Sequence, residues 1–132
     1  MLQDCAFACG VYPADADSFE DSVRRELEGN LRRIRTHPSL ALLCGNNEDY
    51  QIAESEGIAH DDVSTLGTSV APTAHTSRKK YKHFTAARLY EVVFPKIASE
   101  IANVVYHPGS PFGGKSVAET TSGDLHQVQA VS

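Results

Sequence analysis

A short apolar run at residues 40–44 (LALLC) constrains the fold more than any other feature of this sequence. It follows a long amphipathic stretch and a turn containing Pro38, and it ends abruptly in the polar residues 45–49 (GNNED). A short run without polar alternation is typical of a strand that is buried on both faces of a parallel sheet. The sequence therefore predicts an α/β fold in which helices cover this strand.

The stretch before the run predicts a helix from Ser18 to about residue 34. Its apolar residues recur at helical spacing, and oppositely charged residues stand four apart. We expect the Ser18 hydroxyl to cap the first turn and His37-Pro38 to end the helix. The apolar stripe consists of Phe19, Val23, Leu27, Leu31 and Ile34, and the charged pairs are Glu20–Arg24, Asp21–Arg25 and Glu28–Arg32.

Further elements continue the alternation of strands and helices. They are a buried strand within residues 1–8, a helix from about Thr85, a strand at 104–106 and a short strand within 125–131. Pro95 falls inside the second helix, so a kink or break is expected near residues 91–94. Residues 52–84 lack apolar periodicity and are predicted to form a poorly ordered connection. This order of elements favours parallel strands joined by right-handed crossovers.

Charge and cysteine content exclude several classes of protein. The chain carries 17 acidic and 12 basic residues, a net charge of −5, which gives no electrostatic case for binding nucleic acid or membranes. Its three cysteines and six histidines show no metal-like or disulfide-framework spacing, so no metal and no cofactor are predicted. No apolar run is long enough to span a membrane, and the first ten residues do not resemble a signal peptide. We therefore expect a cytoplasmic protein.

Glu48 is the strongest candidate for chemistry. It directly follows the predicted strand at 40–44, and reactive groups in α/β folds gather where strands end. A carboxyl screened from water there can have a raised pKa and act as a proton donor. The amide of Asn47 beside it can hold a sugar hydroxyl. Most Asn-Asn-Glu triplets are surface turns, however, and these residues alone leave that alternative open.

Several longer stretches resemble the β-mannosidases of glycoside hydrolase family 2, and most closely their fungal intracellular type. They follow the family's order over most of the chain, with residues 52–84 the poorest part. The stretches are LQDCAFACGVYP, LRRIRTHPSLALLCGNNEDYQ, LYEVVFPKI, YHPGSPFGGKS and GDLHQ.

The resemblance implies a fold, an activity and a set of site residues. The fold would be an incomplete (β/α)8 TIM barrel, with residues 1–132 supplying about strands three to six. The activity would be retaining hydrolysis of terminal non-reducing β-D-mannose residues from β-mannosides such as mannan oligosaccharides and N-glycan cores. Glu48 would be the proton donor and acceptor, and Asn47 would bind the sugar's 2-hydroxyl. Asp4, His107 and His126 would complete the substrate site, with a β-mannoside oligosaccharide as partner and the oligomeric state open.

The chain also departs from the family pattern. The family's nucleophilic glutamate lies in a segment resembling S-E-F-G, which these 132 residues do not contain, so we expect the chain alone to have little activity. Leu2 and Val128 stand where the family usually has tryptophan. Residues 70–84 do not resemble the family's connection and are interpreted as inserted sequence. Two alternatives remain open: a non-catalytic carbohydrate- or partner-binding remnant, and a non-functional truncated gene product.

Overall fold

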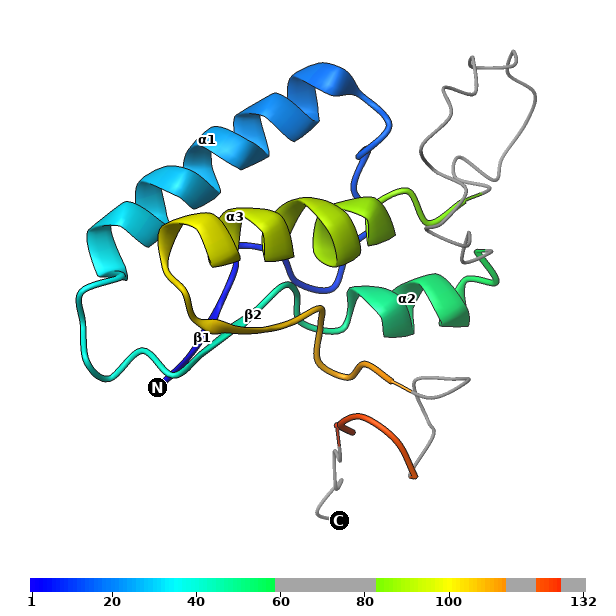
Figure 1. The fold of residues 1–132 in the computed structure, drawn as a ribbon. Helices are drawn as coiled ribbons and strands as arrows, with labels where there is room; N and C mark the ends of the chain where they lie inside the picture. Colours follow the sequence, from blue (N-terminus) through cyan, green and yellow to red (C-terminus); the bar gives the residue numbers. More distant parts are fainter. Residues whose placement is uncertain (59–82, 114–120, 127–132) are drawn as a thin grey trace.

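The computed structural model describes residues 1–58, 83–113 and 121–126, and its centre is a sheet of three short parallel strands (Figure 1). The strands β1 (Leu2–Asp4), β2 (Leu42–Cys44) and β3 (Val105–His107) lie side by side in chain order. Asp4 pairs with Cys44, and Cys44 pairs with His107. The last residues of the three strands therefore form one row at one edge of the sheet.

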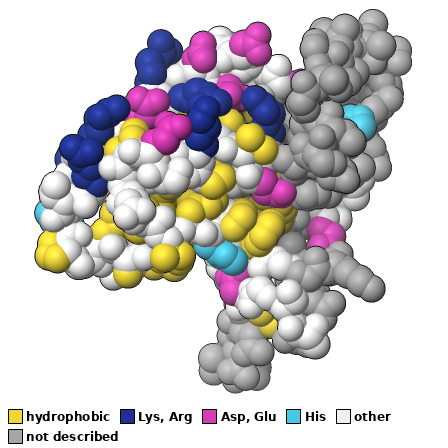
Figure 2. Space-filling view, in the orientation of Figure 1, with side chains coloured by type: hydrophobic (Ala, Val, Ile, Leu, Met, Phe, Trp, Pro, Cys, Tyr) yellow, Lys and Arg dark blue, Asp and Glu magenta, His cyan; other side chains and the backbone are white. Residues whose placement is uncertain are grey.

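The helices cover only one face of the sheet. Helices α1 (Asp17–Ile34) and α3 (Phe94–Ile101) lie together on that face (Figure 1). Leu43 in the central strand is 1% exposed there, because side chains alternate along a strand. On the opposite face Leu2 is 55% and Val105 is 66% exposed. Hydrophobic side chains accordingly reach the surface along the strands, whereas charged side chains gather over α1 (Figure 2).

Helix α1 matches the predicted apolar stripe. Val23, Leu27 and Leu31 are buried, and Phe19 and Ile34 pack against them in part. The helix begins differently from the prediction, because the N-cap is Ala16, which makes no side-chain cap. A tight turn from Pro13 places the Ala16 carbonyl oxygen so that it accepts the first helical hydrogen bonds, from the N–H groups of residues 19 and 20. The capping role expected of Ser18 is wrong for that reason.

Two of the predicted charged pairs form along α1. Arg24 contacts Glu20 at 2.8 Å, and Arg32 lies 3.9 Å from Glu28. Glu20 also accepts a hydrogen bond at 3.2 Å from Arg88, which lies at the start of the second helical region. Glu20 therefore links α1 to the segment that packs beside it.

The second helical region changes its hydrogen-bonding pattern next to Pro95. A π-helix, η2 (Leu89–Val93), runs directly into α3, which has Pro95 in its first turn. Proline lacks the N–H that a regular α-helix would donate at this point, and the wider π-turn accommodates the loss. The π-turn lies where a kink or break was predicted, near residues 91–94, but the helix continues through it into α3.

Aromatic side chains from distant segments form the core under the helices. Phe7, which follows β1, lies 5.8 Å from Tyr90 and 5.5 Å from Phe94 between ring centroids. Tyr50 lies 5.0 Å from Phe84. Tyr90, Phe94 and Phe84 have no exposed surface. The ring contacts therefore link the segment after β1, the helix that carries Tyr50 and the second helical region.

Four sequence predictions need correction or concern residues outside the described ranges. The strand predicted within residues 1–8 is only β1, and it is not buried, since Leu2 and Asp4 are exposed. The connection predicted at 52–84 begins inside helix α2 (Asp49–Ser55), and its last residue, Phe84, is in the core. Residues 59–82 lie outside the described residues. The insertion predicted at 70–84 therefore lies outside them too, except for residues 83 and 84. The final strand predicted within 125–131 lies mostly beyond residue 126.

In the described parts of the chain, no helix has both the length and the apolar character that a membrane span requires. All three cysteines are free: Cys44 is buried, Cys5 is partly buried and Cys9 is exposed.

Candidate active site

The loops that leave the three strands meet at the carboxyl edge of the sheet. Asn47 forms parallel bridges with Ala8 on one side and with Ser110 on the other. The Glu48 N–H donates to the Ser110 carbonyl oxygen at 2.8 Å, and the Cys9 N–H donates to the Asn47 carbonyl oxygen at 2.8 Å. These bonds extend the sheet past its strands and bring the side chains that follow each strand into one cluster.

Glu48 lies at the centre of this cluster, just before α2. Its backbone is left-handed, with φ 66° and ψ 5°, which is costly for a residue other than glycine and is frequent at functional sites. Its side chain is 29% exposed and accepts two hydrogen bonds: from the His126 ring, at 2.9 Å between Nδ1 and Oε1, and from the Cys9 thiol at 3.3 Å. A half-buried carboxylate on a strained backbone thus lies where the loops converge.

The expectation of a raised pKa for Glu48 is wrong. The hydrogen bonds from His126 and then from Cys9 stabilise the ionised carboxylate and lower its pKa, outweighing the effect of partial burial. The sequence did not reveal this because His126 is 78 residues away in the chain.

Two buried polar residues beside Glu48 hold its backbone in place. Asn46 and Asp49 have no exposed surface. The Asn46 side chain accepts a hydrogen bond from the Asp49 N–H at 3.1 Å and donates one to the Pro108 carbonyl oxygen at 2.9 Å. Asn46 therefore ties the start of α2 to the loop after β3.

Asp49 ties the same point to the other side of the fold. Its carboxylate accepts hydrogen bonds from the Gly10 N–H at 2.9 Å and from the Tyr90 hydroxyl at 2.5 Å. Burial raises the pKa of Asp49, although these two hydrogen bonds partly oppose the shift. Sequence analysis did not single out Asn46 or Asp49 as site residues. The available signal was the change from a wholly apolar strand to the run of polar residues at 46–49.

The two predicted histidines belong to one hydrogen-bonded chain. His126 contacts Glu48 through Nδ1 and the Ser110 hydroxyl through Nε2, the latter at 2.8 Å. The Ser110 hydroxyl also donates to Asp124 Oδ2, and Asp124 Oδ1 lies 3.0 Å from His107 Nε2. Partial burial alone would raise the pKa of Asp124, but hydrogen bonds from Ser110, His107 and the Phe112 N–H lower it. Sequence analysis missed Ser110 and Asp124, although both stand within motifs that it identified.

The other two predicted site residues, Asn47 and Asp4, differ in how close they lie to Glu48. Asn47 lies beside Glu48, and its amide nitrogen is 3.8 Å from the Cys9 sulfur. Asp4 lies at the end of β1, paired with Cys44, whose thiol donates to the Asn46 carbonyl oxygen at 3.3 Å. The cluster therefore brings together Asn47, Glu48 and His126, and Asp124 joins His107 to it, whereas Asp4 lies in the same row as His107 but two strands away.

Glycine is required where the loops after β2 and β3 cross. A Cβ atom on Gly109 would lie 2.6 Å from the Asn46 amide nitrogen, and one on Gly45 would overlap the Pro108 carbonyl oxygen. Both contacts are closer than side-chain atoms tolerate, so the sharp approach of the two loops depends on these residues.

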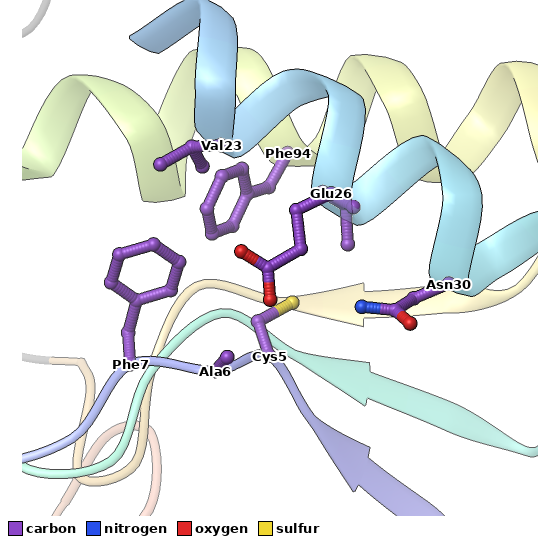
Figure 3. Close-up of a pocket in the computed structure, with 8 residues that line it drawn as sticks. Cys5, Ala6, Phe7, Val23, Glu26, Asn30 and Phe94 are labelled. Carbon is purple, nitrogen blue, oxygen red and sulfur yellow. The ribbon is translucent and has the colours of Figure 1, made fainter. Parts of the chain in front are cut away.

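A small hollow of about 20 Å³ lies elsewhere in the fold, between α1 and the segment after β1. Figure 3 shows Glu26 and Asn30 reaching toward it from α1, with Cys5 and Phe7 on the opposite side. It is large enough for about one water molecule and does not include the cluster around Glu48. Within the described ranges, no group of three or more histidine, cysteine or acidic side chains is placed to hold a metal ion.

Comparison with known proteins gives a consistent set of relatives. The chain is 40% identical over 129 residues to beta-mannosidase B of Emericella nidulans and 39% identical to those of Aspergillus clavatus and Thermothelomyces thermophilus. Each match covers 96% of this chain but only 14% of the relative. The fold matches a crystal structure of beta-D-mannosidase from Dictyoglomus thermophilum with a TM-score of 0.68 and 31% identity, over 96% of this chain and 13% of that one. No family model matches.

Proposed function

Because the chain is homologous over nearly its whole length to a segment of the β-mannosidases, we propose that it carries the acid/base half of a retaining β-mannoside hydrolase site. The observation that carries this proposal is the position of Glu48 at the carboxyl edge of a parallel sheet, where the loops from all three strands converge. Reactive groups of parallel α/β enzymes occupy this edge.

In the proposed reaction Glu48 protonates the oxygen of the leaving group and later takes a proton from the attacking water. A second carboxylate, about 5–5.5 Å away in retaining enzymes, attacks the sugar and forms the glycosyl intermediate. Glu48 is suited to proton transfer because it is half-buried, held by a fixed backbone and still open to solvent on one side. No metal enters the proposed chemistry.

The neighbours of Glu48 are proposed to bind the sugar. The Asn47 amide can donate to and accept from a hydroxyl, and its contact with the described residues is a long one, 3.8 Å from the amide nitrogen to the Cys9 sulfur. His107 and Asp4 lie at the ends of their strands, where the ring of a mannose unit could reach them. Their direct contact with substrate is part of the proposal.

The proposed complete fold is a (β/α)8 barrel of which this chain forms part of the wall. A parallel sheet with helices on one face and an uncovered opposite face is consistent with such a segment. Leu2 and Val105 on that face would then pack inside the barrel.

A chimeric enzyme tests the function. The residues of this chain replace the matching segment of the Emericella nidulans beta-mannosidase B, and release of the leaving group from an aryl β-D-mannoside is measured. We expect an active chimera in which Glu48→Gln lowers kcat/KM for a poor leaving group at least ~100-fold, the typical contribution of general acid catalysis. Glu56→Gln is the matched control, since Glu56 is exposed at the end of α2.

Equal activity of the Glu48→Gln and Glu56→Gln chimeras would overturn the proposed role of Glu48. The 132 residues alone are expected to show little turnover, since the segment resembling S-E-F-G that carries the family's nucleophilic glutamate is not among them. Turnover by the isolated chain close to that of the chimera would refute this expectation.

A second candidate function is binding to a protein partner without catalysis. The exposed apolar residues Leu2 and Val105 on the uncovered face favour this alternative, because such patches mark association surfaces. Saturable binding of mannose oligosaccharides measured by calorimetry would separate a retained carbohydrate site from a surface that binds only protein.

A further inference from the structure

We propose that His126 stores, as a second ring proton, the proton that Glu48 donates and recovers, and that Ser110 and Asp124 are positioning residues that keep His126 in this state. The inference rests on the proposed acid/base role of Glu48. It starts from one continuous chain of contacts: Glu48 Oε1 to His126 Nδ1 at 2.9 Å, His126 Nε2 to Ser110 Oγ at 2.8 Å, and Ser110 Oγ to Asp124 Oδ2.

The number of protons available in this chain fixes the direction of each hydrogen bond. Ionised carboxylates only accept, and a serine hydroxyl has a single proton to donate. Hydrogen bonds hold the pKa values of Glu48 and Asp124 below their ordinary range, so both are carboxylates near neutral pH. Ser110 therefore gives its proton to Asp124, and Glu48 takes its hydrogen bond from the N–H at Nδ1.

The remaining contact decides the state of the imidazole. Since the proton of Ser110 points at Asp124, the contact between Ser110 Oγ and His126 Nε2 needs a proton on Nε2. All the hydrogen bonds from Glu48 through His126 and Ser110 to Asp124 can then form together only when both ring nitrogens of His126 are protonated. A neutral His126 that keeps its proton on Nδ1 would leave either Nε2 or Asp124 Oδ2 without a donor from within these contacts.

The same geometry argues against Ser110 as a nucleophile. A serine nucleophile needs its proton directed at the histidine and N–H groups nearby to stabilise an oxyanion. The next residue, Pro111, has no N–H, and the Phe112 N–H donates to Asp124 at 2.8 Å. Ser110 thus serves to orient His126.

The proton transfer is balanced within the pair. As the leaving group departs, the Nδ1–H bond of His126 breaks and its proton passes through Glu48 Oε1 to the leaving oxygen, so Glu48 ends as a carboxylate and the imidazolium becomes neutral imidazole. When Glu48 takes a proton from the attacking water, the proton returns to Nδ1. Among the described residues, two other titratable groups contact this series of hydrogen bonds. The Cys9 thiol contacts Glu48, and the His107 ring contacts Asp124.

Nitrogen NMR on the 132-residue chain with 15N-labelled histidine tests the inference. The signals of His126 are identified among the six histidines by their loss in His126→Asn. We expect both ring nitrogens of His126 to be protonated at pH 7. In Asp124→Asn the serine proton is free to turn toward Nε2, so the second ring proton should be lost and only Nδ1 should carry one.

Asp124→Ala has the same expected result by removing the acceptor altogether, and it replaces Asp124→Asn if that variant fails to fold. Asp21→Asn is the matched control, because it removes an exposed carboxylate on α1 and should leave the His126 signals unchanged. A single ring proton on His126 in the unaltered chain, or two protons in both Asp124 variants, would overturn the inference. This readout needs no turnover, so failure of the proposed function would appear separately, as an inactive chimera or one indifferent to Glu48→Gln.

Discussion

Replacing Tyr90 with phenylalanine should destabilise the fold through Asp49, the buried carboxylate next to Glu48. Both side chains have no exposed surface, and the Tyr90 hydroxyl donates to Asp49 Oδ2 at 2.5 Å. Phenylalanine keeps the ring that packs on Phe94 and removes only the donor. A hydrogen bond to a charged group contributes about 1.5–3 kcal/mol, so Tyr90→Phe should lower the free energy of unfolding by about 2 kcal/mol.

Tyr106→Phe is the matched control for this change. The Tyr106 hydroxyl donates to the Tyr90 carbonyl oxygen at 2.7 Å, so the same deletion there removes a bond to a neutral acceptor. The expected loss is about 0.5–1.5 kcal/mol. Urea unfolding followed by far-UV circular dichroism suits a chain without tryptophan, and about 2 kcal/mol corresponds to a midpoint shift of about 1 M.

The pH dependence gives a second check on the same pair. Burial raises the pKa of Asp49, and the Tyr90 hydrogen bond partly opposes this shift. Tyr90→Phe should therefore raise the pKa further, so its destabilising effect should grow as pH rises and Asp49 ionises, and shrink as pH falls and Asp49 is protonated. A Tyr90→Phe loss no larger than that of Tyr106→Phe, or one independent of pH, would refute the reasoning.

Three further predictions concern stability and association. The folded chain keeps a proton on Asp49 at pH values where the unfolded chain has lost it, so this group stabilises the fold at low pH and the stabilisation is lost as pH rises from the pKa of the unfolded chain through that of the folded chain. Asp49→Asn should remove this pH-dependent part of the free energy of unfolding, which urea unfolding at several pH values measures. Gly45→Ala should prevent stable folding, because its Cβ would overlap a backbone carbonyl oxygen, whereas Gly29→Ala, with nothing within 4 Å on α1, should raise stability by about 0.5–1 kcal/mol, as thermal unfolding would show. Leu2→Gln combined with Val105→Thr should reduce self-association in light scattering while changing stability little, because both residues are more than half exposed; unchanged scattering would contradict a role for this face in association.

The periodic parts of the fold could be predicted from the sequence. The stripe through Val23, Leu27 and Leu31 has the spacing of one helix face, and the structure buries those three residues. The run at residues 40–44 contains β2, and Leu43 and Cys44 are buried as predicted, whereas Ala41 is exposed and Leu42 is only partly buried. These features are local, so neighbouring residues carry enough information to predict them.

The features that depend on distant residues could not be predicted. Helix α2 has no long apolar period, and it is held by contacts such as the Tyr50 ring on Phe84, 34 positions later in the chain. The exposure of β1 arises because the helices cover only one face of the sheet, which the sequence of that strand does not encode.

The candidate site shows the same division. Glu48 and Asn47 were predicted from the strand that precedes them, and the structure places them at its carboxyl edge. The state of Glu48 was predicted wrongly, because it is set by His126 and Cys9, which come from two other segments. The link through Ser110 also requires the three-dimensional arrangement, since serine is common in loops and carries no signal by itself.

Chemical rescue of Glu48→Ala in the chimera tests the central claim most directly. If Glu48 is the acid/base residue, its removal leaves space beside the glycosyl intermediate for a small anion to attack without general base help. Sodium azide should then restore turnover of an aryl β-mannoside bearing a good leaving group and yield β-mannosyl azide, the configuration that a retaining mechanism requires. Absence of rescue together with full activity of Glu48→Ala in water would contradict the assignment.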